Sequence, residues 1–164
     1  MDKRRQKNEK VSPDEWYTPR WLIERLGQFD TDPCAAPSSV RPFQTAPICY
    51  TKEDDGLSRC WQGVVWLNPP YSKPLIKQFV ERLARHNNGI ALLPNRVDNL
   101  LFQEVVFRYA KSMLFMRHRI KFISPSGEFN SPMYGSCLVA FGKECDKRLR
   151  ECGIEGKYVV LNED

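Results

Sequence analysis

Short apolar runs alternate with segments of helical periodicity, and this alternation restricts the fold more than any other feature of the chain. One helical pattern is carried by Leu75, Ile76, Phe79, Val80 and Leu83. It predicts an amphipathic helix over 74–86 with a basic outer face. The clearest strand candidates lie before and after it, at 63–67, 90–93 and 135–142. Apolar strands that alternate with amphipathic helices favour an α/β fold, with a parallel or mixed sheet covered on both faces.

Weaker patterns predict the remaining elements. Thr18 and Pro19 have the residue types of an N-cap and a first helical position, and Gly27 is a typical stop, so a short helix is expected between them. Asp98 or Asn99 can cap a further helix that runs to about residue 109. The other candidates are short strands at 28–32, 48–51, 112–116, 121–123 and 158–161, and a helix at 145–152.

Three polar segments each follow a strand candidate: Asp32-Pro33, Asp55-Gly56 and 68–71. In open α/β sheets, ligands bind outside the carboxyl ends of the strands. We therefore expect these segments to line one edge of the sheet and to form a single site. Taken alone, the two dipeptides are also ordinary turn sequences.

The tetrapeptide Asn68-Pro69-Pro70-Tyr71 fits one chemistry closely, the methylation of an exocyclic amino nitrogen. Such an amine is a poor nucleophile, because its lone pair is delocalised into the ring. The Asn68 oxygen and the Pro69 carbonyl can accept its N–H bonds and stabilise the charge that develops. The prolines fix φ, and the Tyr71 ring offers a face on which an extruded base can stack. A rigid turn is the simpler alternative for the same four residues.

Length and composition predict one domain. The chain of 164 residues is long enough for a proper core, and we expect a basic, flexible arm at 1–12 followed by a single domain at 13–164. No apolar run of membrane-spanning length and no signal peptide are apparent, which predicts a cytoplasmic protein. The net charge of +5 permits a nucleic-acid partner without requiring one.

The cysteines and histidines do not have the spacing of a metal site. None of the six cysteines forms a CxxC pair, and His86 and His118 lie far apart in the sequence. We therefore expect free thiols in a reducing compartment and no bound metal.

Eight segments match, in order and spacing, the motifs of one known family over roughly residues 16–142. They are Trp16–Pro19, Asp32–Ala36, Tyr50–Leu57, Trp61, Trp66–Ser72, Leu92–Asp98, Arg117–Phe122 and Ser131–Tyr134. On these motifs the chain resembles the phage-type DNA N6-adenine methyltransferases, which use S-adenosylmethionine. The resemblance implies a site-specific enzyme that acts on double-stranded DNA, with protection from restriction as an expected role.

The resemblance also implies a fold and a set of roles. The fold would be a Rossmann-like methyltransferase sheet with helices on both faces. Residues 68–71 would hold the target amine and base. The implied cofactor contacts are Tyr17, Thr18, Pro19, Asp32, Pro33, Cys34, Asp55 and Gly56.

The chain departs from the larger methyltransferase pattern in its first half. No Gly-rich loop follows the first strand, and Ala35 and Ala36 stand where glycines are expected. Only 35 residues separate Asp32 from Asn68, too few for two complete strand–helix units. The cofactor half of the sheet should therefore be compact and partly reduced. No separate target-recognition domain fits, so any sequence specificity must come from loops such as 94–99 and 117–134.

Four basic residues are candidates for DNA contacts: Arg96, Arg117, Arg119 and Lys121. Basic side chains interleaved with aromatic residues can follow a phosphate backbone. A strand edge protected by charge explains the last three equally well, and Arg96 could instead pair with Asp98.

The residues alone leave the substrate open. Cytosine N4 and the side-chain amide of glutamine present the same planar nitrogen as adenine N6, and a non-catalytic DNA-binding protein could keep the same scaffold. Asn68, rather than serine, before Pro-Pro-Tyr favours adenine through the family resemblance.

Overall fold

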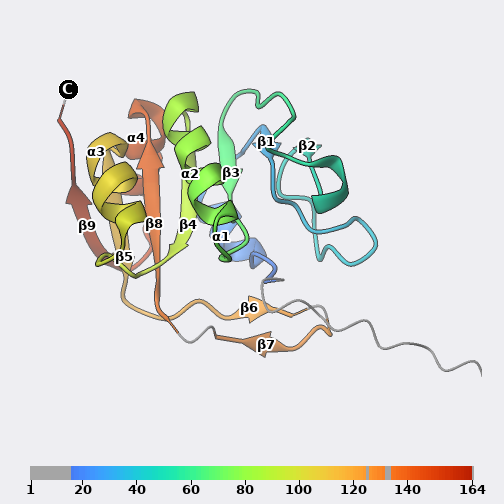
Figure 1. Ribbon diagram of the computed structural model, residues 1–164. Coiled ribbons are helices and arrows are strands. Elements are labelled where there is room, and N and C mark those ends of the chain that lie inside the picture. The colour runs from blue at the N-terminus through green and yellow to red at the C-terminus, as the bar shows by residue number, and fades with distance from the viewer. Residues whose placement is uncertain (1–15, 125, 132–133, 164) are drawn as a thin grey trace, which may run out of the picture.

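A mixed seven-stranded sheet forms the centre of the computed structural model, which describes residues 16–124, 126–131 and 134–163 (Figure 1). The strand order is β2-β1-β3-β4-β8-β5-β9. The strands are β1 (Thr31–Asp32), β2 (Ile48–Cys49), β3 (Val65–Leu67), β4 (Gly89–Pro94), β5 (Ser112–Met116), β8 (Ser136–Phe141) and β9 (Gly156–Val160). The expected basic arm at 1–12 lies outside the described residues.

Strand direction divides the sheet into two parts. β2, β1, β3 and β4 run parallel, with Thr31 opposite Val65 and Leu67 opposite Ala91. β8 is antiparallel to both β4 and β5, and β9 is antiparallel to β5. The predicted mixed sheet is therefore confirmed. Its parallel part brings the carboxyl ends of β1, β3 and β4 to one edge.

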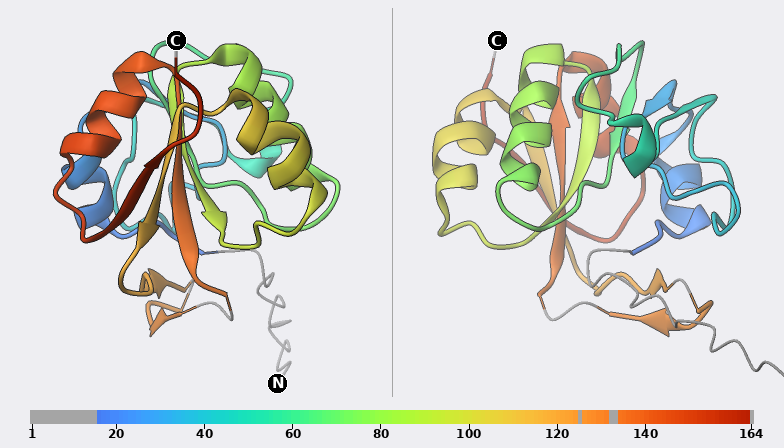
Figure 2. Two further views of the ribbon diagram at one scale, coloured as in Figure 1. Left: turned by 90° about the vertical axis from the view of Figure 1, so that its left-hand side faces the viewer. Right: turned by 45° about the vertical axis from the view of Figure 1, so that its right-hand side comes forward.

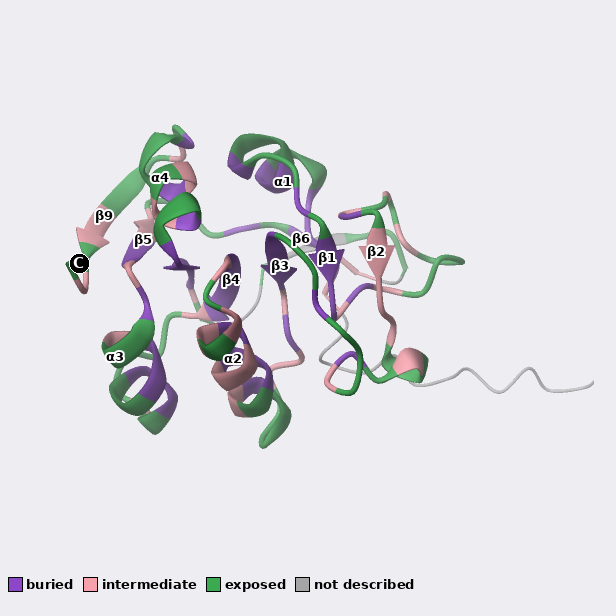
Figure 3. Ribbon diagram, turned by 90° about the horizontal axis from the view of Figure 1, so that it is seen from above, coloured by how far each residue is buried: buried purple, intermediate pink, exposed green. Residues whose placement is uncertain are grey.

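Helices cover both faces of the sheet, as the sequence predicts (Figures 2 and 3). α1 (Arg20–Leu26) and α4 (Lys143–Glu151) lie on one face. α2 (Leu75–His86) lies on the other, beside a π-helical turn, η2 (Phe102–Val106), that continues into α3 (Phe107–Tyr109). None of the helices in the described part of the chain is long and apolar enough to cross a membrane.

Each face of the sheet has its own apolar core. Leu83 and Phe79 of α2 pack with Leu67 on one side, while Leu22 of α1 packs with Trp66 on the other. Leu67 and Trp66 are neighbours on β3, and successive strand residues point to opposite faces. Strands buried on both sides explain why 64–67 is apolar throughout rather than alternating.

The connections between the first three strands are short and irregular. In the described structure, the chain from β1 to β2 contains no helix, and that from β2 to β3 contains only a 3-10 turn, η1 (Lys52–Asp54). The turn is closed by a capping box, in which the Asp54 carboxylate accepts bonds from both the N–H and the hydroxyl of Thr51. This agrees with a chain too short for two complete strand–helix units.

The start of α1 differs from the expectation. The helix begins at Arg20 with Pro19 as its N-cap, so the prediction of Thr18 as N-cap is wrong. The Thr18 hydroxyl is instead a hydrogen-bond partner of Trp66 and Asn68. The predicted stop is confirmed: Gly27 has φ +95° and its N–H donates to the carbonyl of Ile23.

A small hairpin lies across the carboxyl edge of the parallel strands (Figures 1 and 2). It consists of β6 (Phe122–Ile123), which the sequence predicts, and β7 (Phe129–Asn130), which it does not. Tyr17 pairs with Ile123 through two backbone hydrogen bonds of 3.0 and 3.3 Å. The segment before α1 is thereby tied to the hairpin.

We predict that Leu83→Ala lowers the free energy of unfolding by about 2–5 kcal/mol, because the Leu83 side chain is fully buried between α2 and the sheet. Leu100→Ala is the matched control, since the Leu100 side chain is 67% exposed and its loss should change stability by less than about 0.5 kcal/mol. Urea unfolding followed by tryptophan fluorescence measures both values. Equal destabilisation by the two variants would contradict the assigned core.

Candidate active site

Asp32 and Asn68 end up at the same edge of the sheet. Asp32 is the last residue of β1, and Asn68 directly follows β3, which pairs with β1. From β1 the chain turns to β2 on one side, whereas β3 lies on the other side. In open α/β sheets, a change of direction of this kind marks the point outside the carboxyl ends of the strands where a crevice binds the ligand. We call the region between Asp32 and Asn68 the crevice.

The orientation of the Asn68 amide is set by the segment before α1. Its Nδ2 donates to the carbonyl of Trp16 at 3.1 Å and to the hydroxyl of Thr18 at 3.3 Å. No donor in the described part of the chain reaches its Oδ1 in return. The amide therefore keeps an acceptor oxygen available for a ligand N–H.

Tyr71, at the end of the loop 68–71 that follows β3, packs against the core on the α2 face of the sheet, whereas Asn68 contacts the segment before α1. Its hydroxyl is 3.5 Å from the carbonyl of Leu92 on β4, and burial raises the pKa of the phenol. The ring lines a small cavity of about 150 Å³ together with Pro94, Arg96, Tyr134 and Ser136. Most of this lining is ring or methylene surface, which suits a flat, apolar ligand group.

Asp32 is a buried carboxylate, only 3% exposed. Its oxygens accept hydrogen bonds from the N–H of Cys34 at 3.0 Å and from the hydroxyl of Thr45. Desolvation nevertheless dominates and raises the pKa of Asp32 to about 6. A cationic ligand group beside this carboxylate would offset part of the cost of its burial.

The Asp32-Pro33 and Asp55-Gly56 segments meet in the structure. A Cβ on Gly56 would lie 2.0 Å from the carbonyl oxygen of Pro33, so only glycine permits this close approach. Asp55 has a left-handed backbone at φ +54° and an exposed side chain. Cys34 is half-buried, and burial raises the pKa of its thiol well above the usual range.

Two residues to which the sequence analysis gives no site role, Arg82 and Trp61, hold the Gly56 turn. The Arg82 guanidinium donates to the carbonyls of Gly56, Leu57 and Arg59 and lies 4.5 Å from the centroid of the Trp61 ring. The Trp61 indole also donates to the Gly56 carbonyl at 2.8 Å. Desolvation lowers the pKa of Arg82. For Arg82, the position next to the core residue Leu83 on α2 is the sequence signal that could have pointed to its binding of the Gly56 turn.

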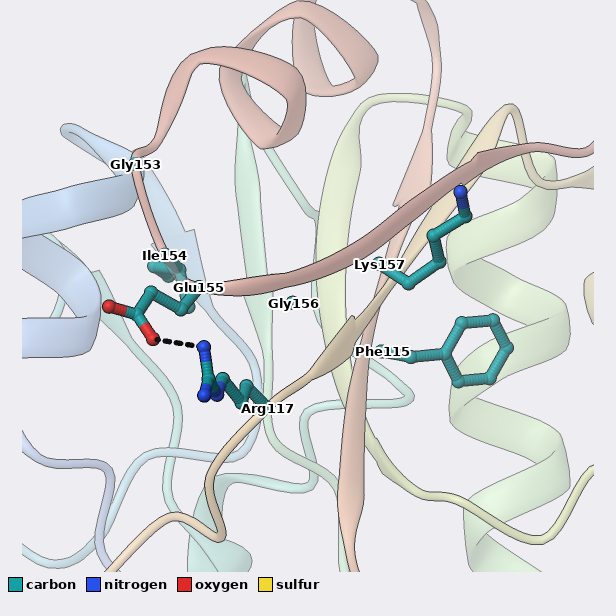
Figure 4. A pocket seen from close by; sticks show the side chains of 7 residues that line it. All are labelled: Phe115, Arg117, Gly153, Ile154, Glu155, Gly156 and Lys157. Atoms are coloured by element: carbon teal, nitrogen blue, oxygen red, sulfur yellow. Dashed lines mark ion pairs between the residues drawn. The ribbon is translucent and has the colours of Figure 1, made fainter.

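The four candidate DNA-binding residues do not gather in one place. Arg96 lies at the Tyr71 cavity, 5.0 Å from the Tyr134 ring. Lys121 is exposed and directly precedes the hairpin strand β6. Arg119, two residues before Lys121, is also exposed. Arg117 lies at the β5–β9 end of the sheet, in a wide depression where it pairs with Glu155 at 3.7 Å (Figure 4). In strand order, β4 and β8 separate that depression from β3, which Asn68 follows.

The residues expected at the cofactor therefore fall into two groups. Asp32, Pro33 and Gly56 lie together on the β1 side of the crevice. The Tyr17–Pro19 segment is buried on the Asn68 side. All six cysteines are free thiols, and the described residues contain no cluster of three or more metal-ligating side chains.

The fold is a mixed α/β sheet with Asp32 and Asn68 at its carboxyl edge, an arrangement compatible with a methyltransferase. The chain belongs to the DNA N-6-adenine-methyltransferase (Dam) family, whose sequence model matches residues 5–148.

A DNA N-6-adenine-methyltransferase of Escherichia phage T1 is 36% identical over 88 residues, which cover 49% of this chain and 35% of that protein. The chain thus matches about a third of the length of this relative. No solved structure matches the chain.

We predict that Asp32→Asn stabilises the protein, and increasingly so as the pH rises. A raised pKa means that the fold disfavours the ionised carboxylate, so the wild type loses stability between about pH 4 and pH 6, where the unfolded chain alone is ionised. The advantage of the variant should grow by about 3 kcal/mol across this window. Urea unfolding of both proteins from pH 3.5 to 7.5 measures it, and a difference that does not vary with pH would contradict the assignment.

Proposed function

We propose that this protein transfers a methyl group from S-adenosylmethionine to N6 of adenine in double-stranded DNA. The observation that carries the proposal is the Asn68 amide, whose two N–H groups are committed to Trp16 and Thr18 while its oxygen is available. Family membership and the name of the phage T1 relative support DNA and adenine as the substrate. DNA as substrate in turn supports an intracellular site of action.

The sheet supports a Rossmann-like arrangement with a reduced first half. The strands β2, β1, β3 and β4 are all parallel. From β1 the chain adds β2 on one side and then β3 on the other, and this reversal of the strand order is the feature that creates a ligand crevice in doubly wound folds. Asp32 ends β1 and Asn68 follows β3, so the two flank the point where such folds bind a ligand, and the proposal places the cofactor and the target base between them.

The β1 side of the crevice suits the cofactor. Asp32 provides a desolvated carboxylate for a cationic group of the cofactor. The close approach of Gly56 to Pro33 brings the loop at Asp55-Gly56 next to the residue that follows Asp32. Cys34 and the exposed Asp55 complete this group. When bound, S-adenosylmethionine supplies an electrophilic methyl group for the target nitrogen. The sequence-based set also includes Tyr17, Thr18 and Pro19, which lie on the Asn68 side.

The β3 side of the crevice suits the target base. The Asn68 oxygen and the Pro69 carbonyl accept the two N–H bonds of the amine, which favours a pyramidal nitrogen with a localised lone pair. Pro69 and Pro70 restrict the backbone that aims these acceptors. The Tyr71 cavity of about 150 Å³ receives the ring of a base turned out of the duplex.

The DNA would approach the edge that carries the hairpin. Arg96 at the cavity, together with Arg119 and Lys121 near β6, can contact phosphates on either side of the extruded base. Arg117, already paired with Glu155, is the most distant of the four from Asn68 in strand order.

A labelling experiment tests the proposal. The purified protein is incubated with methyl-labelled S-adenosylmethionine and unmethylated double-stranded DNA at a stated salt concentration, because phosphate contacts make DNA binding salt-dependent. The DNA is then digested to nucleosides. Label in N6-methyl-2′-deoxyadenosine is the expected result. Label in N4-methyl-2′-deoxycytidine would overturn the choice of base, and cofactor binding without any label would overturn DNA as the substrate.

We predict that Asn68→Ala lowers the transfer rate at saturating substrates by at least about 100-fold, since it removes an acceptor aimed at the developing charge. The dissociation constant for S-adenosylmethionine, measured by calorimetry, should stay within about twofold of the wild-type value. Gln78→Ala, which removes an exposed amide from α2, is the control and should retain full activity. Full transfer by Asn68→Ala would refute the role of Asn68.

A further inference from the structure

The Thr18 hydroxyl is the meeting point of two donors from the β3 segment. It accepts from the Trp66 indole at 3.2 Å and from the Asn68 Nδ2 at 3.3 Å, and Thr18 is only 7% exposed. Trp66 and Asn68 are two positions apart, so their side chains leave the strand on the same face. That face is the one covered by α1, whose preceding residues include Thr18.

These contacts distinguish between the two possible orientations of the Asn68 amide. In the observed orientation, both N–H bonds of Nδ2 find an acceptor, one on Trp16 and one on Thr18. If the amide turned by 180°, its oxygen would face the Trp16 carbonyl, and two acceptors would oppose each other. The turned amide would also present its N–H groups to the target amine, where an acceptor is required.

The acceptors themselves are held by parts of the chain outside the catalytic loop. The Trp16 carbonyl is fixed in place because its neighbour Tyr17 pairs with Ile123 of the hairpin. The Thr18 hydroxyl is fixed because Trp66, which anchors it, is completely buried in the core below α1. The amide orientation is thus set by two contacts, one to a segment paired with the hairpin and one to a hydroxyl that bonds the buried Trp66.

We propose that Thr18 is a positioning residue for Asn68, and not a cofactor contact as the family resemblance implies. Its hydroxyl keeps the Asn68 oxygen turned toward the target amine, so its loss slows transfer without weakening the binding of S-adenosylmethionine. The proposal rests on the proposed function, because it assigns Thr18 a role within that reaction.

The test compares three variants with the wild type in the labelling assay and in calorimetric titration with S-adenosylmethionine. Thr18→Val removes the hydroxyl and keeps the shape of the side chain, whereas Thr18→Ser keeps the hydroxyl. Thr45→Val is the matched substitution on the other side of the crevice, where the Thr45 hydroxyl donates to Asp32. Assays are run well below the melting temperature of each variant, so that a general loss of stability does not affect the rates.

For Thr18→Val we expect the transfer rate at saturating substrates to fall about 10- to 100-fold, since misaligned catalytic groups cost rates of this order. The dissociation constant for S-adenosylmethionine should stay within about twofold of the wild-type value. Thr18→Ser should recover the rate to within about threefold. Thr45→Val should instead raise the dissociation constant. A purely structural role for Thr18 would not produce this division between rate and affinity.

Two results would overturn the proposal while leaving the proposed function intact. One is an unchanged transfer rate in Thr18→Val beside an active wild type. The other is a raised dissociation constant for S-adenosylmethionine at an unchanged maximal rate, which would return Thr18 to the cofactor site. Absence of label with the wild type would overturn the proposed function itself, and the role of Thr18 with it.

Discussion

The parallel pairing of β1, β3 and β4 is the constraint on which the rest of the structure depends. Because the three strands run in the same direction, their carboxyl ends meet, and Asp32 and Asn68 reach one edge although the chain between them is short. Parallel strands also require cover on both faces, which α1, α4, α2 and η2 provide. The position of the site follows from the same pairing that forms the core.

Much of the fold could be predicted because its signals are local. The apolar run at 64–67, the helical spacing from Leu75 to Leu83 and the stop at Gly27 are each readable within a few residues, and the structure agrees with them. The carboxyl-edge location of Asp32 and Asn68 could be predicted for the same reason, since it needs only strand direction. The strand β7 could not be predicted, because Phe129 is the one large apolar residue among the polar residues and glycine of 126–131 and leaves no strand pattern.

The contacts that complete the site could not be predicted, because they join segments far apart in the sequence. Thr18 has the residue type of a helix cap, and nothing nearby in the sequence indicates that Trp66 and Asn68 both donate to its hydroxyl. Arg82 reads as part of a solvated basic face, yet it binds three carbonyls of the Gly56 turn. In both cases a tertiary contact overrides a reasonable local interpretation, and in both cases the contact holds a functional loop.

The pairing of Tyr17 with Ile123 has a consequence for the order in which the molecule assembles. The two residues come from opposite parts of the chain, so closing this contact costs more loop entropy than pairing neighbouring strands. It involves a single bridge outside the central sheet rather than a ladder of several residue pairs, and contacts with few backbone hydrogen bonds open at a lower free energy than the core strands. The sheet can therefore be complete while the Trp16 carbonyl is not yet in place beside Asn68. Local opening near the hairpin would release this acceptor before any strand of the sheet separates, while Thr18 stays bonded to the buried Trp66.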